Sequence, residues 1–266
     1  MKKEAVILIH GMGRSHRSMR KLEVFLKAKG YVTYNRSYPS TVANVERSAV
    51  HYINSALANI SHESISTVHF VTHSLGGLLV RYFLSNHQMK KLGRIVMLSP
   101  PNQGSEVAER YRKHFWYKWI TGIPGQQLYQ NNNPLLKELK PLKTEVGIIA
   151  GTRSSDPWFN HAFEHPHDGK VSVNGAQLPE MKQMIQVPHG HTFIMNKASV
   201  KNHIANFLAT GNFYRPTQKI SMFNFVKDNK ATKQSADPRT GSTKKAPPQP
   251  YPEAQKDDHD DKQPPR

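Results

Sequence analysis

The amino-acid sequence predicts an α/β fold, in which a mostly parallel central sheet is covered by helices on both faces. Short apolar runs rich in β-branched residues alternate with segments of helical periodicity along most of the 266 residues. Runs of this kind between turn residues are typical of strands that are buried on both faces. Strand–helix alternation favours parallel pairing through right-handed crossovers. The length suits one large domain whose core needs no covalent staple.

Six apolar runs of four to six residues are the predicted strands. In chain order they cover residues 5–9, 31–35, 67–72, 94–98, 145–150 and 184–187. The segments between and after these runs look helical, and over residues 45–60 the apolar residues are spaced three and four apart, which places them on one helix face. The predicted helices cover residues 18–29, 45–60, 75–85 and 198–209. Gly30 and Gly211 follow two of them and are expected to cap their ends.

The composition changes near Phe225. Residues 226–266 contain many Lys, Asp, Pro and Gln residues and almost no large apolar ones. Such a segment cannot bury enough apolar area to offset the entropy lost on ordering. We therefore expect an α/β domain over residues 1–225 and a disordered tail over residues 226–266.

The chain is strongly basic, with a formal net charge of +18, and it has no cysteine. The lack of cysteine excludes disulfides and thiolate metal sites. A basic excess favours anionic partners, but the charges are scattered and no nucleic-acid-binding motif is recognisable. The sequence therefore predicts a solvated basic surface and no nucleic-acid partner, with weak contact to anionic membranes as the alternative.

The apolar run over residues 5–9 is too short for the core of a signal peptide. No stretch approaches the roughly 18 apolar residues that cross a bilayer. A soluble, cytoplasmic protein is the expectation.

A serine stands where the third predicted strand meets the next helix, in Val71-Thr72-His73-Ser74-Leu75-Gly76-Gly77. A sharp strand-to-helix turn strains the serine backbone and lifts the hydroxyl above the sheet edge. Gly76 fits the nucleophile-elbow pattern G-x-S-x-G, whereas Thr72 stands where that pattern has glycine. Ser74 is the candidate nucleophile, and an ordinary glycine-rich turn is the alternative.

Two further motifs lie at strand ends, His10-Gly11-Met12-Gly13 and Ser99-Pro100-Pro101-Asn102-Gln103-Gly104-Ser105. Together with the serine turn they resemble the α/β-hydrolase superfamily, most closely its small bacterial lipase and esterase branch. The resemblance covers roughly residues 4–210. It implies the α/β-hydrolase fold, a Ser–His–acid triad and ester hydrolysis without a cofactor. It also implies an oxyanion hole, for which the Met12 and Leu75 N–H groups are the candidate donors.

In that fold the acid follows the nucleophile in the chain and precedes the histidine. Asp168 resembles the family's acid loop, because a glycine follows it directly. Asp156 is the rival, although Pro157 after it favours a plain turn.

Two histidines precede the last predicted helix. His191 resembles the family's catalytic histidine, because it leads into a helix start, and His189 is the alternative. The predicted triad is Ser74, Asp168 and His191. The imidazole would act as general base and then general acid, and the carboxylate would hold its tautomer.

A second histidine group, His161, His165 and His167, lies near Glu164 and Asp168. Histidine and carboxylate side chains are natural zinc ligands. Their spacing matches no recognised metal motif, so surface histidines are favoured and no metal is predicted.

Residues 105–143 form a long insertion rich in aromatic side chains. It either caps the serine and shapes an apolar acyl pocket, or packs its aromatics in an ordinary core. The favoured function is hydrolysis of carboxylic esters with lipid-like acyl groups. The alternatives are a thioesterase, amidase or acyltransferase with the same triad, or a non-catalytic binding protein on this scaffold.

Overall fold

The computed structural model describes residues 3–60, 64–154, 157–164 and 166–213, which all belong to one compact unit, Met1–Pro216. The tail predicted over residues 226–266 lies outside the described residues.

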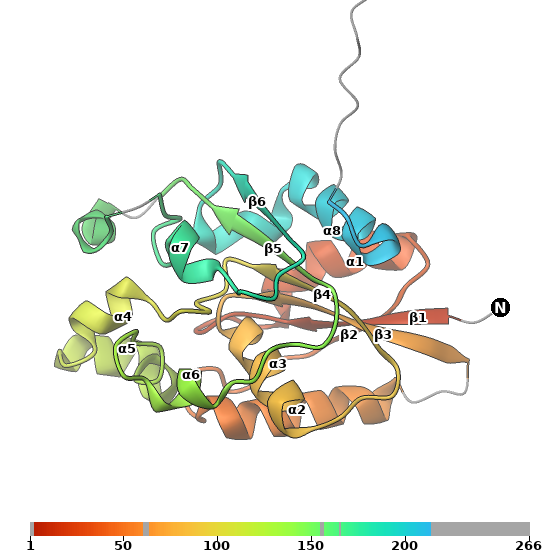
Figure 1. The fold of residues 1–266 in the computed structure, drawn as a ribbon, viewed down its shortest axis with the longest axis horizontal. Coiled ribbons are helices and arrows are strands. Elements are labelled where there is room, and N and C mark those ends of the chain that lie inside the picture. Colours follow the sequence, from red (N-terminus) through yellow and green to blue (C-terminus); the bar gives the residue numbers. More distant parts are fainter. Residues whose placement is uncertain (1–2, 61–63, 155–156, 165, 214–266) are drawn as a thin grey trace, which may run out of the picture. The chain divides into compact units, whose positions relative to one another are not determined.

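A six-stranded sheet stands at the centre of the described residues, and every neighbouring pair of strands is parallel (Figure 1). The strands are β1 Lys3–Ile9, β2 Val32–Asn35, β3 Ile65–His73, β4 Leu92–Leu98, β5 Val146–Gly151 and β6 Gln183–Val187. Their order across the sheet is β2-β1-β3-β4-β5-β6. The predicted α/β class and its six strands are confirmed.

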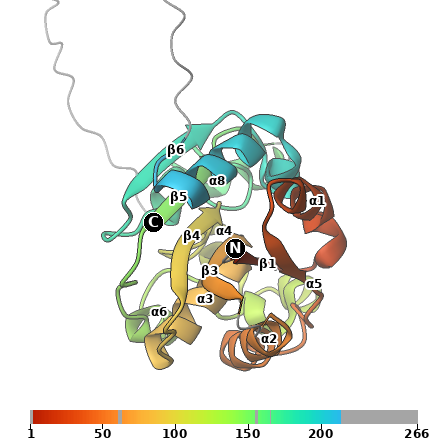
Figure 2. The same ribbon diagram turned by 90° about the vertical axis from the view of Figure 1, so that its right-hand side faces the viewer.

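Helices cover both faces of the sheet, as Figures 1 and 2 show. On one face lie α1 Arg20–Ala28 and α8 Ala198–Thr210, and on the other lie α2 Val45–Asn59 and α3 Leu75–Asn86. Strand side chains alternate between the two faces. In β1, Val6 and Leu8 belong to the apolar cluster of α1 and α8, whereas Ile7 belongs to the cluster of α2 and α3.

The helix predicted over residues 18–29 is shorter than expected. A 3-10 turn, η1 His16–Met19, precedes α1, because the Ser18 N–H and hydroxyl both donate to the Ser15 carbonyl oxygen. Local side-chain bonding of this kind competes with regular helix hydrogen bonds. The glycine caps are as predicted, since Gly30 and Gly211 have φ values of 92° and 74°.

The insertion over residues 105–143 contains three helices, α4 Glu106–Tyr111, α5 Phe115–Gly125 and α6 Pro134–Glu138. Helix α5 kinks at Gly122, which has φ 61° and ψ −156°. A Cβ atom there would lie 1.7 Å from the Thr41 carbonyl oxygen, so this close approach requires glycine. Tyr117 and Leu128 are buried, whereas Phe115 and Trp119 are exposed. The insertion therefore contributes both to the core and to the surface.

Three short helical segments follow β5 and β6, namely η2 Pro157–Ala162, α7 Val173–Ala176 and η3 His191–Asn196. Because all strands are parallel, the loops that follow them emerge at one edge of the sheet. The loops with the predicted site residues are all of this kind. No helix within the described ranges is long and apolar enough to cross a bilayer.

Candidate active site

Ser74 occupies a sharp turn between β3 and α3. Its φ of 51° and ψ of −122° are strained for a residue with a side chain. The turn is held because the Ser74 N–H donates to the Leu98 carbonyl oxygen and the Ser74 carbonyl accepts from the Gly77 N–H, both at 2.9 Å. Thr72 lies fully buried within β3 and does not prevent the turn. The elbow geometry is therefore present despite the missing first glycine.

Gly76 lies where α3 passes closest to β1. A Cβ atom at this position would be 2.7 Å from the Ile9 carbonyl oxygen and 3.0 Å from the Ile9 side chain. Any larger residue would push the helix away from the sheet and displace the elbow.

The two predicted oxyanion donors come from the start of α3 and from the loop after β1. Leu75 is the first residue of α3, where backbone N–H groups have no partner within the helix and carry its positive dipole end. Met12 lines the same cavity as Ser74. In the described part of the chain, neither the Met12 N–H nor the Leu75 N–H donates a hydrogen bond. Both are therefore available to an anionic oxygen.

The loop that contains Met12 is held by a buried histidine. His10 Nδ1 lies 2.9 Å from the Gly11 carbonyl oxygen, and His10 Nε2 accepts from the Tyr38 N–H at 3.3 Å. The Tyr38 hydroxyl donates to the His10 carbonyl oxygen at 2.8 Å, and the two rings stack at 4.3 Å. Only the neutral imidazole satisfies both ring contacts. Burial lowers the pKa of His10 to about 4, which the Gly11 contact only partly opposes.

Asp168 and His191 form a buried pair. His191 Nδ1 lies 2.7 Å from Asp168 Oδ2, and the His191 N–H donates to the Asp168 carbonyl oxygen at 3.0 Å. Asp168 Oδ1 accepts from the N–H groups of Lys170 and Val171 at 3.0 and 2.9 Å. Because a carboxylate can only accept, Nδ1 carries the hydrogen and Nε2 is left free to act as a base.

The surroundings of Asp168 favour its charged form. Burial alone would raise the pKa of this carboxyl group, but His191, the Ser99 hydroxyl and the Val171 N–H outweigh burial and lower the pKa. Carboxylates that accept several hydrogen bonds stay ionised in this way.

Ser99 is a residue of the site that the sequence did not reveal. Ser99 directly follows β4, has a φ of 43° and is buried. Its hydroxyl bonds to Asp168 and accepts from the Gly151 N–H at 3.2 Å. It is therefore in place to orient the carboxylate. The sequence feature that could have pointed to Ser99 is its position before Pro100 at the end of a strand. Its contact with Asp168, however, depends on the order of the strands in the sheet.

His73, next to Ser74, supports the histidine loop. Its Nε2 lies 2.9 Å from the His191 carbonyl oxygen, and the two rings are 4.7 Å apart. Burial holds the pKa of His73 well below its ordinary value, and His191 adds to this effect. A neutral His73 therefore packs against and anchors the loop.

The alternative residues lie in different surroundings. His189 is half-exposed, does not line the Ser74 cavity, and its Nε2 is 3.5 Å from the Ser199 hydroxyl. Asp156, the rival acid, lies outside the described residues.

The two described histidines of the group near Asp168, His161 and His167, make other contacts. His161 Nε2 bonds to the Tyr111 hydroxyl, and the His167 ring stacks on Phe163 at 4.0 Å. His165 lies outside the described residues. Among residues with described positions, no group of three or more His, Asp or Glu side chains could hold a metal ion.

A cavity of about 380 Å³ joins these parts. The Ser74 and His191 side chains line it, although the Ser74 hydroxyl makes no hydrogen bond to any described residue. The rest of the wall is mainly apolar and comes largely from the insertion. It includes Val107, Trp116, Tyr117, Ile120, Leu128, Phe159 and Val171.

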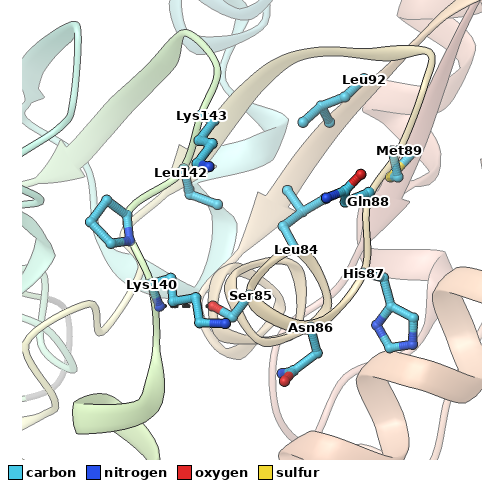
Figure 3. A pocket seen from close by; sticks show the side chains of 11 residues that line it. Leu84, Ser85, Asn86, His87, Gln88, Met89, Leu92, Lys140, Leu142 and Lys143 are labelled. Carbon is cyan, nitrogen blue, oxygen red and sulfur yellow. Dashed lines mark hydrogen bonds between the residues drawn. The ribbon is translucent and has the colours of Figure 1, made fainter.

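A second cavity, of about 600 Å³, also contains a serine and a histidine (Figure 3). It lies at the far end of α3, a 12-residue helix roughly 18 Å long. The Ser85 hydroxyl there donates to the Arg81 carbonyl oxygen and accepts from the Lys140 N–H. No carboxylate lines this cavity within the described ranges, and the hydroxyl is already used, so it lacks the groups for acyl transfer.

Several solved structures share this fold at low sequence identity. The mature lipase BlEst2 of Bacillus licheniformis has a TM-score of 0.61 and 16% identity, over 80% of this chain and 93% of that one. The Pyrococcus furiosus esterase Pf2001 has a TM-score of 0.56 and 17% identity, over 78% and 83%. Phospholipase PlaB from Legionella pneumophila has a TM-score of 0.55 and 18% identity, over 66% and 46%. These likenesses confirm the α/β-hydrolase fold.

No curated protein matches the chain in sequence. The family model for palmitoyl protein thioesterase matches residues 5–139, a stretch that contains Met12 and Ser74 and ends before Asp168. This match spans just over half of the 266 residues, and the chain therefore belongs to the palmitoyl protein thioesterase family.

Proposed function

We propose that the chain is a serine hydrolase that cleaves acyl esters through an acyl-enzyme on Ser74. The observation that carries this proposal is the buried Asp168–His191 pair, whose imidazole lines the same apolar cavity as the strained serine. An acid, an imidazole and a hydroxyl placed in this way form the arrangement that acyl transfer uses on many unrelated folds.

In the proposed reaction, the Ser74 oxygen attacks the acyl carbon while His191 Nε2 takes the hydroxyl proton. Asp168 keeps the other ring proton on Nδ1 and balances the imidazolium charge. The Met12 and Leu75 N–H groups stabilise the oxyanion. The imidazolium then protonates the leaving alcohol, and a water molecule activated by the same imidazole releases the acid.

The serine–histidine hydrogen bond would form on substrate binding. Catalytic hydrogen bonds are often long or misaligned in the free enzyme and shorten in the Michaelis complex. The Ser74 backbone is held at both ends of its turn, which leaves rotation about the Cα–Cβ bond to aim the hydroxyl.

The wall of the cavity favours an apolar acyl group. Its aromatic and aliphatic side chains gain free energy by covering methylene groups, at roughly 0.8 kcal/mol for each group buried. The insertion thus serves as one side of the acyl pocket in this proposal. A thioesterase is the second candidate, because the family model that matches the chain is named for thioester cleavage.

The test is a substrate series with acyl chains from acetyl to palmitoyl, offered both as p-nitrophenyl esters and as S-acyl thioesters. We expect turnover by the wild type and a loss on the order of 10⁵-fold or more in Ser74→Ala and His191→Ala, as for other serine triads. His189→Ala is the matched control and should keep nearly full activity. Equal rates in all four proteins would rule out this mechanism, and turnover of thioesters alone would favour the second candidate.

A further inference from the structure

Exposed apolar side chains gather around the mouth of the Ser74 cavity. Seven large ones are strongly exposed in the described residues, and four of these are on α5: Phe115, Trp119, Ile120 and Ile123. Phe193 follows two residues after His191, and its ring lies 5.6 Å from the Arg14 guanidinium, which lines the cavity. Val42 follows Thr41, which accepts a hydrogen bond from the Ile123 N–H. The seventh, Val24, is on α1.

The exposed face of α5 continues into the cavity. Ile120 is 59% exposed and also lines the cavity, and the neighbouring Trp116 and Tyr117 form part of its wall. Phe115 and Trp119, one helical turn apart, are 83% and 85% exposed and do not line it. An acyl chain leaving the cavity past Ile120 would meet this apolar surface. Patches of this kind mark sites that bind a protein or a membrane.

The charges around the patch favour an anionic partner. Residues 110–123 include Arg110, Arg112, Lys113 and Lys118 and contain no acidic residue. Lys113 and Lys118 are exposed on either side of Phe115. Aromatic side chains interleaved with lysines suit the boundary between lipid headgroups and acyl chains, where rings enter the apolar layer and cations reach phosphates.

We propose that α5 and residues 110–114 bind the surface of an anionic phospholipid bilayer, with Phe115 and Trp119 in the interface and the lysines on the headgroups. The cavity mouth then faces the lipid, so that an acyl substrate can enter from the membrane. This last step rests on the proposed function. The binding itself requires no turnover. This surface contact is local and reversible, and it needs no membrane-spanning segment.

The test measures co-sedimentation of the full chain with vesicles of phosphatidylcholine, with or without phosphatidylglycerol. The wild type should bind the anionic vesicles. Phe115→Ser with Trp119→Ser should weaken this binding about tenfold or more, because two large apolar side chains are lost. Lys113→Gln with Lys118→Gln should weaken it about 25-fold at low salt, at roughly fivefold for each cation near an anionic surface. Val24→Ser removes an exposed apolar side chain from α1 and should bind like the wild type.

Turnover of a soluble short-chain ester separates docking from catalysis. None of the five substituted residues lines the cavity, so all three variants should keep wild-type rates. The proposal is overturned if the aromatic pair leaves vesicle binding unchanged, or if neutral vesicles bind equally well. It is also overturned if sedimentation velocity shows that the aromatic pair instead holds two copies of the chain together. If the protein has no esterase activity but its vesicle binding still depends on Phe115 and Trp119, the docking proposal holds and the proposed function is refuted.

Discussion

The carboxyl edge of the sheet and helix α5 line the same cavity but are held in different ways. At the sheet edge, Asp168 and His191 are buried and joined by both side-chain and backbone hydrogen bonds. Along α5, the apolar side chains are only partly covered, and several face solvent. A reacting group must be held within a fraction of an ångström, whereas an acyl wall or a lipid contact needs only shape and polarity. Substitutions at the edge should therefore impair every substrate, and those near α5 should act selectively.

After the loss of Ser74 or His191 themselves, the largest expected effect at the sheet edge comes from Asp168→Asn. An asparagine donates where the carboxylate accepts, so it favours the wrong tautomer of His191, and kcat should fall by about 10⁴-fold for esters of every chain length. Asp156→Asn is the matched control and should change kcat by less than about twofold. A large loss in Asp156→Asn with little in Asp168→Asn would move the acid to the rival position.

The buried His10 makes the free energy of unfolding depend on pH. The pKa of His10 is about 4 in the folded chain and about 6.5 in the unfolded chain, so the unfolded state binds more protons between these values. Stability is therefore full above about pH 6.5 and falls as the pH drops towards 4, by about 2 kcal/mol between about pH 7 and about pH 5. Urea unfolding at the two pH values measures this change. His10→Gln cannot titrate there and should show a smaller difference, and an unchanged difference would contradict the assignment.

Ser99→Ala tests whether the edge depends on groups beyond the triad. Loss of the hydroxyl removes one hydrogen bond to Asp168 and should lower kcat by about tenfold with little change in KM. It should also raise the folded-state pKa of Asp168 towards its unfolded value, so less stability is lost when acid protonates this carboxyl group. Ser85→Ala removes another buried and hydrogen-bonded hydroxyl from the far end of α3. Ser85→Ala should lower stability but leave kcat unchanged. If Ser85→Ala lowered kcat as much as Ser99→Ala does, the role of Ser99 would be structural only.

The smallest expected effect lies on the insertion side of the cavity. Val107 of α4 is buried in the cavity wall, and Val107→Phe fills space that a long acyl chain would occupy. The ratio of kcat/KM for palmitoyl over butyryl esters should fall by about fivefold to tenfold, because a few methylene contacts decide such preferences. An equal loss for both esters would indicate damage to the reactive edge instead.

The same contrast explains what could be predicted from the sequence. The six strands and main helices follow from local periodicity, and Ser74 stands out because a strand, a serine and two glycines are adjacent in the chain. The predicted Asp168 and His191 do meet in one buried pair. Ser99 could not be assigned, since its contact with Asp168 depends on the loops after β4 and β5 emerging side by side.

The exposed face of α5 could not be predicted from the sequence either. A cap and an ordinary core were both open for the insertion, and the described structure has features of each: Tyr117 is buried, while Trp119 is exposed. At its kink, Gly122 of α5 packs against Thr41, which is far away in the chain, and a contact of this kind cannot be read from local periodicity. Apolar periodicity gives a helix its face, but tertiary packing decides whether that face is covered.

The most direct test of the central claim is covalent labelling of the full chain with a fluorophosphonate, followed by mass spectrometry of the labelled peptide. Such probes react with serines that a neighbouring base has activated. We predict one label on Ser74 in the wild type, none in Ser74→Ala, and much slower labelling in His191→Ala. A wild-type chain that takes no label, or that takes it on another residue, would contradict the assignment of Ser74 as the nucleophile.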